Sequence, residues 1–391
     1  MEDLPVLPPG SKAICIRCEA DLESRVGRSV VATLACSVAI LALLFPTNLL
    51  PLIRIDVFGI HSENRIADGI VLLLQNGWFL LAAISAILVI ALPFVRFGLL
   101  GAVLASLRLG RRPDWLGPAF RWAIVLDPWA MLDVFLLASF VGYYRLAHIS
   151  QATVTIEAGG ACFVAAALLT MLARATLDRR TVWRAIGEEG ALTPGDPALA
   201  CTVCDLVQPI GHRRCRRCRA PLHARKPASL PRTTALLIAA FALFFPANLY
   251  PMDVSSHLGT VENYTIFSGV RQLFESGLWP LGVLIFCTSI AIPAGKILVT
   301  GWCVWSIKRR SRRHLMARAQ ICRIVAELGR WSKIDPFTIV FFVPLMNFRP
   351  LVSAAAGWGA TAFLMMTLLT MAASGAFDTR LMWDAAAAAG E

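Results

Sequence analysis

The sequence predicts an all-α integral membrane protein with eight transmembrane helices, arranged as a tandem, parallel repeat of four-helix units. Three observations predict this fold. Of the 391 residues, 57% are hydrophobic and only 16% are charged, which is too little charge to cover a soluble surface of this size. The apolar residues form long segments with basic clusters between them. Much of the sequence also recurs 200 positions later.

Eight segments have the roughly 20 apolar residues that a helix needs to cross the hydrocarbon core. They cover residues 30–53, 77–107, 121–147, 157–177, 232–253, 277–307, 331–349 and 354–376. The second and sixth are long, so we expect them to tilt or to extend past the lipid. No cleavable secretion signal is expected, because the N-terminus is polar to about residue 28. The predicted domains are 1–28, 29–183, 184–229, 230–383 and 384–391.

Basic residues predict the orientation. They gather in the N-terminal segment, after the second span, in the central linker and after the sixth span, where 308–313 reads "KRRSRR". The loops 54–68 and 253–276 carry few. Because basic loops stay in the cytoplasm, we expect a multi-pass protein of the bacterial inner membrane with both termini cytoplasmic. The net charge of +12 then indicates anionic lipid and not nucleic acid as the partner.

The repeat is clearest at the end of the first span of each half. "LFPTNLLP" at 44–51 recurs as "FFPANLYP" at 244–251, and the four spans in each half give both copies one orientation. The first proline removes a backbone donor, the second keeps the residue before it out of a helix, and the asparagine can bond freed backbone groups. Two interpretations stay open: a helix terminator on the periplasmic side, or a docking surface or lipid portal. The residues of this exit motif are Pro46, Asn48, Pro51, Pro246, Asn248 and Pro251.

Two CxxC pairs precede the second unit: "CTVC" at 201–204 and "CRRC" at 215–218. Four cysteines at this spacing predict a small cytoplasmic zinc ribbon, with Zn²⁺ as a structural cofactor. A dithiol redox pair is the alternative, but two pairs without a βαβ context favour zinc. The predicted ligands are Cys201, Cys204, Cys215 and Cys218.

A second, truncated ribbon precedes the first unit. "CIRCEADL" at 15–22 aligns with "CRRCRAPL" at 215–222, so Cys15 and Cys18 match the second pair only. These two cysteines either bind zinc, with other ligands or between two chains, or are a relic without stable metal.

Ionisable residues within spans are functional candidates, because burying them in lipid is costly. Arg96 and Lys296 occupy equivalent places after a repeated proline, and Asp133 and Asp335 do so in the next span. Helical rise places Arg96 and Asp133 both about 18 Å from the cytoplasmic end, so they can pair. Asp127 is another buried carboxylate, although its place before a proline near a span end also fits a helix cap.

The second half adds more polar groups. Ser289 and Ser332 have apolar counterparts in the first half, and Thr370 has a matching threonine. This network is either a structural salt bridge or a polar cavity that binds a headgroup or transfers a proton. Neither GxxxxGK[ST], HExxH nor GxSxG occurs, so an enzyme is not expected.

The duplicated four-span unit, the four-cysteine ribbon, the FPxNLxP exit and the W-x-x-x-D-x-F motif at 129–135 and 331–337 resemble the paraquat-inducible protein A family of inner-membrane proteins. The resemblance covers nearly the whole chain. It implies a lipid-transport component that passes phospholipid to a tunnel of periplasmic MCE-domain proteins. It also implies a transmembrane polar network of Ser289, Lys296, Ser332, Asp335 and Thr370, and zinc at the four ribbon cysteines. The alternatives are a zinc- or redox-responsive stress protein and a transporter of a non-lipid solute.

Overall fold

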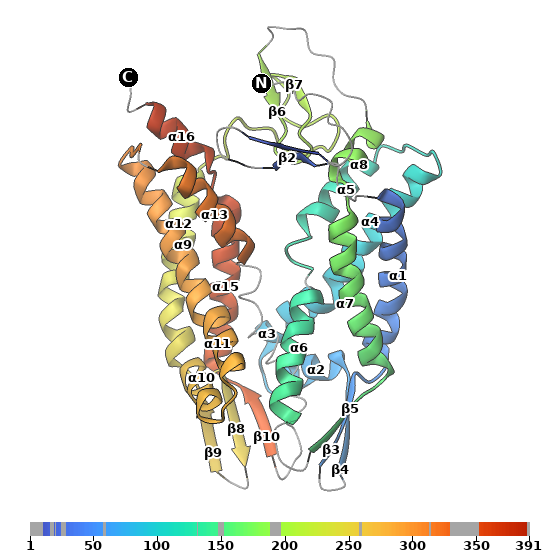
Figure 1. The fold of residues 1–391 in the computed structure, drawn as a ribbon, viewed down its shortest axis with the longest axis vertical. Helices are drawn as coiled ribbons and strands as arrows, with labels where there is room; N and C mark the ends of the chain where they lie inside the picture. Colours follow the sequence, from blue (N-terminus) through green and yellow to red (C-terminus); the bar gives the residue numbers. More distant parts are fainter. Residues whose placement is uncertain are drawn as a thin grey trace.

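The computed structural model describes residues 11–15, 19, 21–24, 29–57, 60–130, 132–147, 152–187, 197–257, 260–312, 314–328 and 352–388. Figure 1 shows two helical bundles side by side, one from each half of the chain. Small sheets lie at one end of both bundles, and the cysteine-bearing segment lies at the other end.

The first half consists of helices of unequal length. They are α1 (Val30–Leu49), α2 (Ile66–Gln75), α3 (Phe79–Ser85), α4 (Leu92–Arg108), α5 (Leu116–Val125), α6 (Leu132–Ala147), α7 (Ala158–Thr176) and α8 (Arg179–Ile186). A π-helical segment, η1 (Ala86–Ala91), joins α3 to α4. The Ser29 hydroxyl caps α1 by accepting from the N–H of Ala32 at 3.3 Å, which satisfies one of the free donors of its first turn.

The second half repeats this order in the residues that the structure describes. Its helices are α9 (Ser229–Leu249), α10 (Ile266–Glu275), α11 (Trp279–Phe286), α12 (Ile292–Lys308), α13 (Leu315–Leu328), α15 (Trp358–Ala376) and α16 (Arg380–Ala387). The π-helical segment η2 (Cys287–Ala291) joins α11 to α12. The sequence repeat is therefore also a repeat of structural elements.

Six helices of the described residues are long and apolar enough to cross a membrane. They are Val30–Leu49, Phe79–Arg108, Ala158–Thr176, Ser229–Leu249, Trp279–Lys308 and Trp358–Ala376, close to six of the eight predicted spans. The predicted span 121–147 is instead divided between α5 and α6. The chain turns at Asp127 and Pro128, because proline disfavours a helical residue before it. The predicted span 331–349 lies outside the described residues.

Both 30-residue helices contain their π-helical segment at the same place. Pro93 and Pro293 follow these segments closely. Proline has no N–H to donate, and its ring clashes with the carbonyl four residues earlier, so the helix widens locally to accept it. Such widened turns are frequent at functional sites. Each π-helical segment ends about one turn before the buried basic residue of its half, which is Arg96 in the first half and Lys296 in the second.

The expectation of an all-α fold is wrong at one end of the molecule. There β3 (Ile53–Val57) lies between β4 (Ile60–Asn64) and β5 (Ala152–Ile156), with both pairs antiparallel. The second half forms the same sheet from β8 (Asp253–His257), β9 (Thr260–Tyr264) and β10 (Val352–Ala356). Side chains that alternate between buried and exposed, at Ile53, Arg54 and Ile55, match a strand with one face covered.

The exit motif ends α1 at Leu49 and α9 at Leu249, as expected from its second proline and its asparagine. Leu50 is extended, with φ −91° and ψ 154°, as expected before a proline. The Asn48 amide donates to the Leu44 carbonyl at 2.7 Å, and the Asn248 amide donates to the Phe244 carbonyl at 2.8 Å. Each asparagine thus bonds a carbonyl of the last helical turn.

The exit motif is also held by the first turn of the last long helix of its half. The Gly159 N–H donates to the Pro51 carbonyl at 3.1 Å, and the Gly359 N–H donates to the Pro251 carbonyl at 3.0 Å. A Cβ atom would lie 2.5 Å from the Pro51 oxygen at Gly159, and 2.5 Å from the Tyr250 oxygen at Gly359. Only glycine allows this approach. The motif therefore ends one helix and binds it to another.

The two halves meet along α2, α3 and α15. Leu73, Leu81 and Phe363 are fully buried in one apolar cluster that includes residues of both halves. The rings of Trp78 and Trp358 pack edge to face, with centroids 5.0 Å apart. Apolar and aromatic packing thus joins the halves.

The cysteine-bearing segment packs on the first half, although it directly precedes the second half in sequence. Its four cysteines share a buried cluster with Phe120 and Trp183, whose ring centroids are 4.8 Å apart. Gly117 of α5 lies against the carbonyl of Arg217, and the Arg217 guanidinium donates to the Gly187 carbonyl at 3.0 Å. This segment therefore bridges the two halves.

A polar junction ties the linker to the end of α15. The Lys226 N–H donates to the Asp378 carboxylate at 3.1 Å, and the Ser229 hydroxyl accepts from the Asp378 N–H at 2.9 Å. Burial would raise the pKa of Asp378, but hydrogen bonds from Arg380 and Lys226 outweigh it and lower the pKa to about 2. Asp378 therefore stays ionised at neutral pH.

Candidate functional site

A buried cluster of charges lies in the first half, around the turn between α5 and α6. Arg96 of α4 is 2% exposed, and its guanidinium pairs with Asp127. Its predicted partner Asp133 pairs instead with Arg174 of α7. The prediction from helical rise assumed one continuous helix over 121–147, and the turn at Asp127 removes that assumption.

Arg174 joins the two carboxylates. Its Nε lies 2.9 Å from Asp127 Oδ1, and its Nη2 donates to the carbonyls of Asp127 and Ala130, both at 3.2 Å. The more exposed Arg179 adds a contact of 3.4 Å to Asp127. The buried charges are therefore compensated by one another, which offsets much of the cost of placing them among apolar helices.

Arg174 was not predicted to be part of this network, and for Asp127 the sequence left open a buried carboxylate or a cap. Arg174 lies near the end of its span, so by position alone it belongs to the basic linker. The repeat contained a usable signal, because the counterparts of Arg174 and Asp127 in the second half are Ser374 and Gly329. The second copy therefore lacks the side chains of Arg174 and Asp127 at the equivalent positions.

The second half holds its buried cation differently. Lys296 of α12 is 2% exposed, and its Nζ donates to the Thr370 hydroxyl of α15 at 3.1 Å. Ser289, in η2 on the same long span, is fully buried, and its hydroxyl lies 3.4 Å from that of Thr288. The structure thus brings two of the predicted network residues into contact and places a third on the same span.

The remaining two network residues, Ser332 and Asp335, lie outside the described residues. Within the described ranges, no carboxylate lies within ion-pair distance of Lys296. An ammonium without an opposite charge is costly among apolar helices. The site is therefore polar and buried, and its described part has an excess of positive charge.

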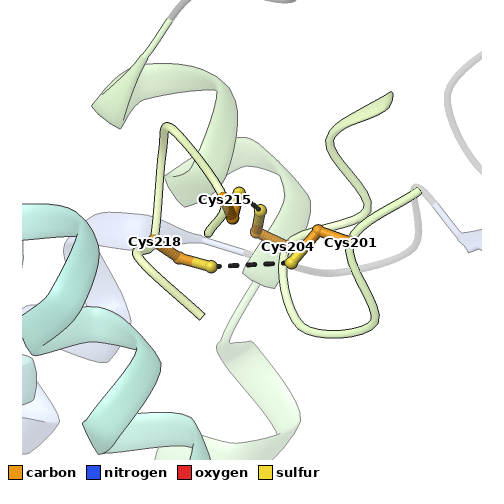
Figure 2. A group of neighbouring side chains, drawn as sticks. All are labelled: Cys201, Cys204, Cys215 and Cys218. Atoms are coloured by element: carbon orange, nitrogen blue, oxygen red, sulfur yellow. Dashed lines mark hydrogen bonds between the residues drawn. The ribbon is translucent and has the colours of Figure 1, made fainter. Parts of the chain in front are cut away.

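The four predicted metal ligands come together, as Figure 2 shows. They are buried, and their Sγ atoms all lie within 4.8 Å of one another. Cys201 and Cys218 have sulfurs 3.6 Å apart, and Cys204 and Cys215 have sulfurs 3.4 Å apart. Tetrahedral zinc with Zn–S bonds of about 2.3 Å separates its sulfurs by about 3.8 Å. The cluster could therefore hold a metal ion, and its dimensions fit zinc.

Tight turns build this ligand arrangement between β6 (Ala198–Ala200), β7 (Val207–Pro209) and the following loop. The Asp205 N–H donates to the Cys201 carbonyl at 3.1 Å, and the Arg219 N–H donates to the Cys215 carbonyl at 2.9 Å. Asp205 and Arg219 both have a φ of +56°. Each turn directs both cysteines of its pair toward the same point.

Cys15 lies in a turn of the same kind. The Glu19 N–H donates to the Cys15 carbonyl at 2.8 Å, and Glu19 has a φ of +53°. Strands β1 (Lys12–Ile14) and β2 (Asp21–Ser24) pair on either side of this turn. Cys18 lies outside the described residues. The truncated segment therefore has the same closing hydrogen bond and positive φ as the two cysteine turns of the complete segment.

Comparison with known proteins confirms the resemblance found in the sequence. The family model described as Paraquat-inducible protein A matches residues 30–187 and again 230–387. The chain is similar to the intermembrane transport protein PqiA of Escherichia coli K12, at 28% identity over 97% of this chain and 93% of the relative. It is also similar to the lipophilic envelope-spanning tunnel protein A of that strain, at 28% identity over 98% of this chain and 88% of the relative. A probable intermembrane transport protein of Haemophilus influenzae is 26% identical over 97% of this chain and 92% of the relative. No solved structure matches the chain significantly.

Proposed function

Because the chain belongs to the paraquat-inducible protein A family, we propose that it is an inner-membrane component of an intermembrane lipid-transport system. It would move phospholipid between the inner membrane and a tunnel formed by a periplasmic MCE-domain protein, and so maintain the cell envelope. Similarity along nearly the full chain to relatives named for intermembrane transport and for an envelope-spanning tunnel carries this proposal. Those names describe transport and not catalysis.

The orientation follows from the basic loops. The cysteine-bearing segment and both termini would lie in the cytoplasm, and the two three-stranded sheets would lie in the periplasm. The central segment is rich in arginine, whereas the sheet ends are poor in basic residues, which supports this orientation. In this arrangement the exit motifs and sheets form the face that meets the periplasmic partner.

The second half is the better candidate for the working site. Arg96 is neutralised by Asp127, which fixes the first half in one arrangement. Lys296 contacts the neutral hydroxyl of Thr370 instead. We propose that Asp335 and Ser332 complete the surroundings of Lys296. Proton uptake and release by the Lys296–Asp335 pair would then couple lipid movement to the proton gradient. No nucleotide-binding loop is present to supply another drive.

The four-cysteine site would bind Zn²⁺ through Cys201, Cys204, Cys215 and Cys218. The ligand type, the sulfur spacing and the burial support this assignment. Four thiolates leave no open position on zinc, so the site would be structural. The site lies between the first bundle and the linker that leads to α9. Zinc would therefore stabilise the position of the linker, and so of the second half, relative to the first half.

The test of this function is Asp335→Asn in cells that lack the native protein. We expect normal membrane abundance but loss of envelope integrity and of lipid delivery to the co-purified periplasmic partner. The comparison variant is Asp133→Asn, which should lower stability while the folded fraction still transports lipid. Full complementation by Asp335→Asn would remove the network from the mechanism. Absence of lipid and of any periplasmic partner from the purified wild-type chain would overturn the function itself.

A further inference from the structure

A polar cavity lies between the cysteine-bearing segment and the first bundle. Its volume is about 510 Å³, and it is bordered by the loop before α5, the end of α8, strand β7 and the second cysteine turn. Its charged and amide lining residues are Arg112, Asp114, Gln208, Arg216, Arg217 and Arg219. This cavity belongs neither to the buried lysine site nor to the cluster of sulfurs.

Gln208 is the most informative residue of this lining. It is 3% exposed, and its Oε1 accepts from the Arg216 N–H at 3.3 Å. Its Nε2 is buried and has no hydrogen-bond partner in the part of the chain that the structure describes. Buried amide donors are nearly always paired with protein, water or ligand. An unpaired donor on a residue that lines a cavity therefore points to an acceptor that the described residues do not supply.

The charges around Gln208 define the kind of acceptor. Four guanidiniums and one carboxylate, that of Asp114, line the cavity, so positive charge dominates. Guanidiniums offer several N–H donors in a planar fork, which matches the oxygens of a phosphate group. One of them, Arg217, already donates to the Gly187 carbonyl at 3.0 Å and is held in place.

We propose that this cavity binds a phosphate-bearing anion, with the Gln208 amide and the surrounding arginines donating to its oxygens. The anion is either the headgroup of an anionic phospholipid or a free phosphate compound, since both present the same oxygens. The proposal does not rest on the lipid-transport function, because it concerns binding at the cysteine-bearing end of the molecule.

The test compares two double variants that remove equal charge. Arg112→Gln with Arg219→Gln removes two exposed arginines of the cavity, and Arg111→Gln with Arg213→Gln removes two exposed arginines that do not line it. Zinc-loaded full-length protein in neutral detergent is titrated calorimetrically with inorganic phosphate. The same proteins in nanodiscs of phosphatidylcholine, with and without phosphatidylglycerol, are assayed for lipid retention by native mass spectrometry.

We expect the cavity variant to bind at least about tenfold more weakly than the wild type, and the control variant to bind like the wild type. Gln208→Glu, which keeps the acceptor but replaces the donor by a carboxylate, should also weaken binding, with zinc content and thermal stability as checks of folding. Binding of inorganic phosphate identifies a free anion, whereas selective retention of phosphatidylglycerol alone identifies a headgroup. Equal losses in both double variants, or no binding of either probe by the wild type, would overturn the proposal.

Discussion

The Nζ of Lys296 donates to the hydroxyl of Thr370 at 3.1 Å and so joins α12 to α15. At the equivalent places of the first half, Arg96 pairs with Asp127, and the Thr170 hydroxyl donates to the Ala166 carbonyl of its own helix. Duplication has therefore produced one copy with a compensated charge cluster and one with a cation beside a neutral hydroxyl. Among the described residues, less opposite charge surrounds Lys296 than Arg96, so the second cation is easier to perturb.

Replacing Thr370 by valine should impair transport while keeping the shape of the side chain. The variant loses the acceptor of the Lys296 ammonium, and a hydrogen bond to a charged group corresponds to about tenfold in rate or binding. Thr170→Val is the matched control, and we expect its lipid-transfer rate to stay within about twofold of the wild type. Equal losses in both variants, measured with purified protein in vesicles, would contradict a special role for the second half.

Replacing Arg174 by methionine should destabilise the protein strongly. The change leaves Asp127 and Asp133 with reduced compensation, and breaking a buried ion pair costs about 3–5 kcal/mol. Arg179→Met removes a half-exposed partner of the same carboxylate and should cost less than about 1 kcal/mol. Thermal unfolding in detergent measures both. Similar unfolding temperatures for the two variants would show that Arg174 does not organise the cluster.

Gly359→Ala should disrupt the exit motif. The added Cβ would lie 2.5 Å from the Tyr250 carbonyl oxygen, and such overpacking costs about 1–3 kcal/mol. Gly375→Ala is the control in the same helix, since its Cβ meets nothing within 4 Å, and alanine should stabilise that position by about 0.5–1 kcal/mol. Unfolding temperatures should therefore shift in opposite directions. An unchanged unfolding temperature for Gly359→Ala would show that the start of α15 can move away from the exit motif.

Purified protein should contain one zinc ion per chain by metal analysis. Cys201→Ser should lose this zinc, whereas Cys287→Ser should keep it, because Cys287 is exposed and far from the cluster in sequence. Metal loss should loosen the packing of Arg217 against Gly117 and Gly187, so amide exchange at the start of α5 and the end of α8 should increase. Unchanged amide exchange after zinc removal would show that the metal does not support the packing of the cysteine-bearing segment on the first half.

The sequence was a reliable guide wherever a single segment contained the whole signal. Six long spans and the four-cysteine spacing depend on residues close together in the chain, and the structure contains both. The sheets were not predicted, because β3 pairs with β5 almost a hundred residues away. Short strands beside long apolar helices carry too little periodic signal to be recognised.

The charge cluster shows the same difference between signals contained in one segment and contacts between distant segments. The sequence identified Arg96 and Asp133 as buried charges, because each lies within an apolar segment. It could not assign their partners, because the turn at Asp127 ends α5 and changes the depth and direction of the residues of α6 that follow. Arg174 lies at the end of a span, so its sequence position does not show whether its side chain is buried or part of the exposed linker. The structure shows that it pairs with Asp127 and Asp133.

Composition, hydropathy, basic loops and cysteine spacing thus determined by themselves that this is a duplicated membrane protein with a candidate metal site. These properties are local, and each apolar or cysteine-rich segment carries its own signal. Only the tertiary structure decided which buried charges neutralise each other, which glycines hold the exit motifs and which half the cysteine-bearing segment contacts. Those choices depend on side chains that lie far apart in the chain and come within about 3 Å only when the helices pack.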